Sequence, residues 1–350
     1  MSKVSTMKLQ DTHLFFSESD LFAQILVTQN RLLEMKQAID FDAFYPVLKE
    51  KLSLVDGVTF NATKWHPLFL FKCVLLGSMF HYSDAQLEYQ LKNRLDFKMF
   101  LDLEAMAEVP DEKTIWDFRE KLIKYNAEKD LFNSFNDQLK LHGFCFEGEH
   151  IIDGTLHECE HRCTSPKTDE MIKQGLLPES RSSNPKSLSQ TDLDASWKTK
   201  GRNSYFGYLG LVMVLKKYKF ITSYHVDSAH VDERVNVPEL VKNIFVSFKI
   251  IADKGFVSEG LKETMKQLGF NFVAMQKEYQ FSSDCLDVRE ENKLISKVRA
   301  RVEHVFGNIT QVIGSNKLRT IGIERNSFQI GMRYMIHNML RFVSIQNGRA

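Results

Sequence analysis

The order of apolar segments in this 350-residue chain predicts an α/β (α+β) fold, a mixed sheet with flanking helices that follows an all-α N-terminal domain. Two observations carry this prediction. Before residue 141 the start signals of helices follow one another with no strand pattern between them. After residue 141, alternating and β-branched runs take turns with helical patterns, as in a sheet covered by helices.

Bulk composition indicates a globular protein of roughly two or three domains. The chain is 43% hydrophobic and 26% charged, which is ordinary for such proteins. Its five cysteines form no evenly spaced framework, and the N-terminus lacks a basic-then-apolar signal pattern. The longest apolar run, residues 67–80, contains Lys72 and is too short to span a bilayer. We therefore expect a cytoplasmic protein without a membrane partner.

The charge is unevenly distributed along the chain. Residues 292–350 hold ten Lys and Arg against only Glu303 and Glu324, a net charge of +8 that leaves −7 for the remainder. A basic segment around an isolated acid favours a polyanionic partner such as double-stranded DNA. A solvated helix surface explains the charge equally well.

The N-terminal half divides into two predicted helical parts. Residues 1–45 are expected to form a helical arm or packing helix, and residues 46–140 a compact helical domain. Within that domain Pro67 opens a helix through residue 80, Ser83 and Gln86 form a capping box, and Asp111 opens the helix 112–125.

The helix 112–125 offers a first candidate for DNA contact. Its residues Lys113 and Arg119 lie largely off the apolar face and would face a DNA groove, although packing alone explains the pattern as well. A polar insertion at 165–203 is expected to be a loop, in which Lys198, Lys200 and Arg202 would follow a DNA backbone or simply be solvated.

The remaining elements alternate between strands and helices. We predict strands at 205–215 and 220–226 joined by a turn, a helix at 235–245, a strand at 248–252, a helix at 258–268 stopped by Gly269, a strand at 270–275, and helices at 290–308 and 327–343.

Three acids stand at positions that suit a metal site. Ile151 and Ile152 lead a buried strand into Asp153, and a similar run leads into Asp253. Glu303 lies within a helical pattern. Each acid taken alone fits a turn or surface residue. Together, hard carboxylate oxygens that converge from two strand ends and a helix would bind divalent cations.

The same strand suggests a second, less favoured metal site. If it continues past Asp153, its alternation places His157, Cys159, His161 and Cys163 on one face. Such a set can bind structural zinc, but surface polar residues are the favoured interpretation.

A series of short motifs, in this order, resembles the DDE transposases of bacterial insertion sequences, the insertion sequence 5 type. The motifs are His66-Pro67, Pro110-Asp111 with Thr114, Phe118-Arg119 and Leu122, then Asp153-Gly154-Thr155, Asp192-Leu193-Asp194-Ala195, Phe206-Gly207-Tyr208, Ala252-Asp253-Lys254-Gly255-Phe256, Val302-Glu303-His304 with Phe306-Gly307, and Ile336-His337-Asn338. The resemblance covers most of the chain from His66 onward, and its order and spacing are more specific than any single motif.

This resemblance implies an RNase H-like DDE catalytic domain at residues 141–350. It implies two Mg²⁺ or Mn²⁺ ions, with Asp153 shared between them and Asp253 and Glu303 each holding one. Arg299 would approach the same phosphate from one helical turn before Glu303. Nearby Lys297 and Arg301 would contact DNA. The protein would bind the inverted repeats of its own element, cleave the strands there and join the 3′ hydroxyls to target DNA, as a homodimer or larger assembly on DNA.

The chain departs from the family pattern at three places. Ser296 and Thr310 stand where relatives have tyrosine and lysine, and Tyr208 is followed by Leu209 where many relatives have lysine. These departures leave open a second hypothesis, a DNA-binding relative that has lost catalysis. A third is a structure-specific nuclease that cuts DNA without joining it.

Overall fold

The N-terminal part of the computed structural model is all helical, as predicted. The structure describes residues 30–53, 64–160, 165–174, 189–242, 249–276, 285–314 and 317–349, together with a few isolated positions. The N-terminal helices are α2 (Arg31–Ala38), α3 (Tyr45–Ser53), α4 (Pro67–Phe80), α5 (Asp84–Asn93), α6 (Leu95–Phe100), α7 (Glu112–Lys124) and α8 (Ala127–Leu141).

The predicted helix starts are confirmed. Pro67 occupies the first turn of α4, where its missing N–H costs nothing. The Ser83 hydroxyl accepts from the N–H of Gln86, and the Gln86 side chain accepts from the N–H of Ser83, which completes the capping box of α5. At α7, Asp111 Oδ1 accepts from the N–H of Thr114 at 2.7 Å.

Other N-terminal details add to the sequence prediction. Of the two alternatives expected for the first helical part, helix α2 is a packing helix, because Leu32 and Met35 are buried in the main core. After α5 the chain forms the short helix α6, and α8 is a separate fifteen-residue helix. The predicted arm before residue 30 lies, apart from isolated positions, outside the described residues.

A mixed sheet forms the second half of the molecule. Its strands are β1 (His150–Glu158), β2 (Ser196–Lys200), β3 (Asn203–Leu215), β4 (Ile221–Ser228), β5 (Lys249–Ala252) and β6 (Asn271–Ala274). Strands β1, β3 and β4 form an antiparallel meander, and β5 and β6 continue the sheet beyond β1 in parallel. This order confirms the predicted RNase H-like fold.

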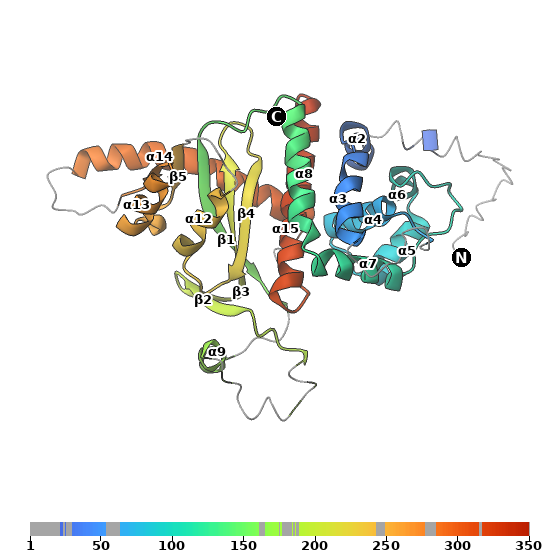
Figure 1. Cartoon of the computed structure of the whole chain (residues 1–350), viewed down its shortest axis with the longest axis horizontal. Coiled ribbons are helices and arrows are strands. Elements are labelled where there is room, and N and C mark those ends of the chain that lie inside the picture. The colour runs from blue at the N-terminus through green and yellow to red at the C-terminus, as the bar shows by residue number, and fades with distance from the viewer. Residues whose placement is uncertain are drawn as a thin grey trace, which may run out of the picture.

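Helices cover both faces of the sheet. On one face α12 (Val237–Val241) and α13 (Glu259–Gln267) bury a small core with residues such as Ile152 and Met213. On the other face α14 (Cys285–Ile313) and α15 (Ile323–Gln346) contribute to the main core. Figure 1 shows α8 and α15 standing between the sheet and the helices α2–α7. No described helix is both long enough and apolar enough to cross a bilayer.

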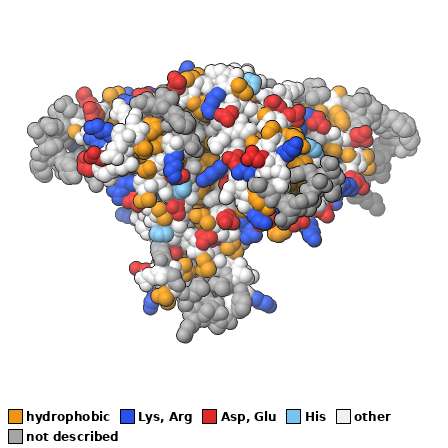
Figure 2. All heavy atoms as spheres, in the orientation of Figure 1, with side chains coloured by type: hydrophobic (Ala, Val, Ile, Leu, Met, Phe, Trp, Pro, Cys, Tyr) orange, Lys and Arg blue, Asp and Glu red, His pale blue; other side chains and the backbone are white. Residues whose placement is uncertain are grey.

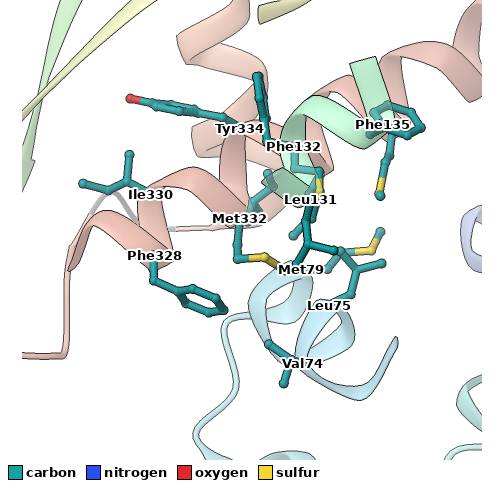
Figure 3. Packing of buried hydrophobic residues seen from close by; sticks show 14 of the residues in the cluster. Val74, Leu75, Met79, Leu131, Phe132, Phe135, Phe328, Ile330, Met332 and Tyr334 are labelled. Atoms are coloured by element: carbon teal, nitrogen blue, oxygen red, sulfur yellow. The ribbon is translucent and has the colours of Figure 1, made fainter. Parts of the chain in front are cut away.

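One core therefore joins the N-terminal helices to the sheet. Figure 3 shows Leu75 and Met79 of α4 packing beside Leu131 of α8 and Met332 of α15. All four side chains are nearly or fully buried. The N-terminal helices and the sheet with its flanking helices thus fold against a shared set of apolar side chains.

The prediction of a structureless loop at 165–203 was wrong in part. The segment contains the helix α9 (Pro166–Lys173) and the strand β2, which pairs with the first half of β3. The segment also holds Asp192, which is fully buried and accepts a 2.8 Å hydrogen bond from the Tyr208 hydroxyl. Its polar composition concealed these elements, although β2 and β3 form a tight hairpin in which Lys200 pairs with Asn203.

We expect Gly207→Ala to destabilise the fold by about 1–3 kcal/mol or more, because the added Cβ would overlap the backbone carbonyl of His157 within the β1–β3 ladder. Gly307→Ala on α14 is the matched control. Its Cβ would meet nothing within 4 Å, and alanine favours the helix by about 1 kcal/mol. Urea unfolding of both variants measures the difference. Equal stability of the two would show that the close approach at Gly207 is absent.

Candidate active site

Strand register brings the two predicted aspartates together. In the parallel ladder of β1 and β5, Ile152 lies opposite Ala252. The next residues are therefore Asp153 and Asp253, side by side where this parallel ladder ends. Asp253 directly follows β5, whereas β1 continues past Asp153 to Glu158 in its pairing with β3, so the expectation that Asp153 ends its strand was wrong. Ligands of α/β folds commonly bind at this edge of a sheet. Asp253 also caps the short 3-10 helix Lys254–Phe256, because its side chain accepts from the N–H of Lys254 at 2.7 Å.

An arginine from α14 connects the two carboxylates. Arg299 Nη2 donates to Asp153 Oδ2 at 2.7 Å, and Arg299 Nη1 donates to Asp253 Oδ1 at 3.0 Å. The Nε of Arg299 is buried and has no hydrogen-bond partner. The guanidinium therefore acts as a single cation shared by two acids.

The surroundings of Asp153 make the ionised form of its carboxyl group costly. Burial raises the pKa of this carboxyl, while Arg299 and the N–H of Gly154 oppose the rise by stabilising the ionised form. The charge of Glu303 adds to the upward shift. A carboxylate that is costly to ionise in a partly buried site gains much from a nearby cation.

The third predicted acid lies close by but outside this pair. Glu303 is exposed one helical turn after Arg299 on α14, and its charge acts on Asp153. The residues that the structure describes contain no group of three His, Cys, Asp or Glu close enough to hold a metal ion. Arg299 lies between the two aspartates instead. The donor chemistry nevertheless fits Mg²⁺ or Mn²⁺, because Asp153, Asp253 and Glu303 offer only hard oxygens.

The predicted DNA contacts fall into two groups. Lys113, Lys200, Arg202 and Lys297 are exposed. The other three are engaged within the protein. Arg119 forms a two-pronged ion pair with Asp84, Lys198 pairs with Glu233 at 2.8 Å, and Arg301 Nη1 donates to the carbonyl of Lys216.

The basic C-terminal segment is also partly neutralised within the fold. Arg319 pairs with Glu160, Arg325 with Glu120 and Arg349 with Glu34. On the face shown in Figure 2, Lys and Arg side chains are interspersed with Asp and Glu. The sequence excess of positive charge therefore does not translate into an equal excess of free cations.

The polar residues along β1 are not surface residues, so that interpretation was wrong. His157 and Cys159 are buried, and the His157 Nε2 lies 3.1 Å from the Tyr334 hydroxyl. Burial lowers the pKa of His157 to about 3, which keeps its ring neutral. His161 and Cys163, the other members of the zinc alternative, lie outside the described residues.

One acid beside the site carried no sequence signal. Glu233 reaches the far side of β1, where its Oε2 would lie 3.0 Å from a Cβ placed on Gly154. It begins a 3-10 turn, Glu233–Asn236, that follows β4. Glu233 lies close to Gly154, the residue after Asp153, only because of how the strands pair in the sheet.

These features define an RNase H-like protein with an acidic site at the end of the parallel ladder between β1 and β5. The family described as "Transposase DDE domain" matches residues 146–339, and the family described as "Transposase domain (DUF772)" matches residues 20–121. The first match covers more than half of the chain. The chain therefore belongs to the DDE transposases, and the two domains together fit the superfamily of insertion sequences 4 and 5.

A solved structure with a similar chain path is the cryo-EM structure of the piggyBac transposase synaptic complex with hairpin DNA. The two chains share 11% identity with a TM-score of 0.46, and the similarity covers 92% of this chain and 77% of that one.

We expect Asp153→Asn to lower the affinity of the protein for Mn²⁺ by about tenfold or more, because it removes a charged ligand from the most buried position of the site. Asp227→Asn is the matched control, since Asp227 lies on β4 of the same sheet and bonds Asn236 instead. Calorimetric titration measures both. Unchanged Mn²⁺ binding by Asp153→Asn would place the metal elsewhere.

Proposed function

We propose that this transposase binds the terminal inverted repeats of its own insertion sequence, cleaves DNA strands at those ends and joins the 3′ hydroxyls to target DNA. The observation that carries the proposal is the convergence of Asp153 and Asp253 on Arg299 at the open edge of the sheet. Family membership supports DNA processing and dependence on a divalent cation. The detailed reaction is our inference from the site.

Asp153, Asp253 and Glu303 would hold the cations, with Asp153 shared because it is central and most buried. When bound, two Mg²⁺ or Mn²⁺ ions would relieve phosphate charge and assist the attacking and leaving oxygens. Arg299 would then release one or both aspartates and turn its guanidinium toward the phosphate. Its fork of donors suits a phosphate as well as it suits two carboxylates.

DNA would be held by the exposed bases near the site and on the helical part. Lys297 lies on α14 close to Arg299, Lys200 and Arg202 lie at the β2–β3 turn, and Lys113 lies on α7. Cleavage of two element ends in one complex would require at least two copies of the chain on DNA.

Cleavage of a DNA fragment that carries the flanks of the gene tests the reaction. We expect end-specific cuts in Mg²⁺ or Mn²⁺ by the intact protein and a loss of at least about 100-fold in Asp153→Asn. Asp227→Asn again serves as the control and should cut normally. Cutting that survives in Asp153→Asn would show that the assigned acids are wrong.

The same assay separates the alternatives. Specific binding with no cutting by any variant would indicate the non-catalytic DNA-binding relative. Thr310 bears on that outcome, since its hydroxyl donates to the carbonyl of Phe306 on its own helix and offers no cation at the position where relatives have lysine. Cutting without strand-transfer products would indicate a nuclease.

We expect the double change Lys200→Gln with Arg202→Gln to weaken binding to DNA of any sequence. The slope of the logarithm of the binding constant against the logarithm of the salt concentration should fall in magnitude by about two, one for each lost phosphate contact. Lys129→Gln with Lys140→Gln, which removes two exposed charges from α8, is the matched control. Fluorescence anisotropy over a range of salt concentrations measures both. Identical slopes would exclude the β2–β3 turn from the interface.

A further inference from the structure

A cavity of about 210 Å³ lies where the N-terminal helices meet α15. Its walls come from α4, α5 and α7 on one side and from α15 and the preceding segment on the other. Val74 and Phe328, both labelled in Figure 3, contribute apolar wall. Since a water molecule takes about 30 Å³, the cavity has room for a small polyatomic ion together with water. It shares no lining residue with the acidic site.

Two buried N–H groups at this cavity have no acceptor. Arg333 is 3% exposed, and its Nη2 donates to the carbonyl of Lys317 at 3.1 Å and to His81 Nδ1 at 3.3 Å. Because arginine can only donate, Nδ1 of His81 must accept, so the hydrogen of this neutral ring is on Nε2. Both His81 Nε2 and Arg333 Nη1 are buried without a hydrogen-bond partner.

Arg333 lacks an ion pair at this cavity, although the charge of Glu160 acts on it from a distance. The other two arginines in the walls are paired, Arg119 with Asp84 and Arg319 with Glu160. Within the described part of the chain Arg333 forms no ion pair. Burial lowers the pKa of Arg333 to about 10, so the side chain keeps its charge at neutral pH. A buried, unpaired cation is costly unless an anion joins it.

We propose that this cavity binds a tetrahedral oxyanion, a phosphate group, that accepts hydrogen bonds from Arg333 Nη1 and His81 Nε2. Ser78 and Ser83, which also line the cavity, add hydroxyl donors. The Gln329 side chain also lines the cavity, and its Oε1 has no hydrogen-bond partner. Rotation of the amide group by 180° would put its NH₂ donor in the place of Oε1. A bound phosphate would bridge the helical part and the catalytic part of the chain.

The first test compares thermal unfolding of the full chain in phosphate and in chloride at equal ionic strength. We expect phosphate to raise the melting temperature of the wild type. In Arg333→Met, which keeps much of the side-chain length, half-saturation should need at least about tenfold more phosphate. Arg325→Met is the matched control, since it removes an arginine from the same helix outside the cavity and should keep the full shift.

His81→Asn provides an independent variant. His81 ends α4 in the left-handed region at φ 56°, which asparagine also tolerates, so the turn should be kept while the Nε2 donor is lost. We expect the phosphate effect to weaken by about tenfold. This variant decides the question if Arg333→Met does not fold. A wild type with no phosphate-specific shift, or both cavity variants with the full shift, would mean that the cavity holds water only.

The affinity of each variant for duplex DNA distinguishes the source of the phosphate. If a backbone phosphate occupies the cavity, Arg333→Met should bind duplex DNA more weakly than Arg325→Met. Equal DNA affinity, together with the phosphate-dependent shift, would identify a site for a free phosphate ion. Neither measurement uses DNA cleavage, so the cavity and the proposed reaction stand or fall separately.

Discussion

The burial of α15 is the constraint on which the other elements depend. The helix contacts α2, α4, α7, α8 and α14 as well as β3 and β4. A buried helix is stable only if its buried polar side chains form hydrogen bonds. Asn338 shows how this is done, because its side chain bonds both backbone groups of Ile221 on β4 and also Asn136 on α8. At the amino end, Asp192 and Asp194 accept from the N–H groups of Gly322 and Ile323.

The position of α15 in turn constrains the acidic site. The segment that precedes it runs beside the end of β1, where the N–H of Leu318 donates to the carbonyl of Glu158 at 2.7 Å. Helix α14 is therefore fixed at its carboxyl end by α15 and along its length by β1 and β5. This placement brings Arg299 over the two strand ends. Register alone aligns Asp153 with Asp253, but the helix packing determines what lies between them.

Local signals explain how much could be predicted from the sequence. Ser83 and Asp111 mark helix starts through bonds to residues three positions away, and Pro67 does so through its fixed backbone angle, so each signal is local in the sequence. The strands that carry Asp153 and precede Asp253 follow from apolar runs of the same local kind. Helix α8 carries a similar signal in Leu131, Phe135 and Leu139, which recur at helical spacing.

Other features were not predictable in this way. Strand β2 pairs with the adjacent β3 across the turn at Gly201 and Arg202, but its polar composition lacks the apolar alternation that marks a strand. Arg299 was expected near a phosphate, yet its contact with both aspartates depends on a helix that packs across the sheet.

The balance of charge at a site also depends on partners that are distant in sequence. Both proposed binding sites are places where the chain leaves charge incompletely compensated, negative around Asp153 and positive at Arg333. Since a buried charge without full compensation lowers the stability of the fold, a bound ligand of opposite charge would raise that stability at each site.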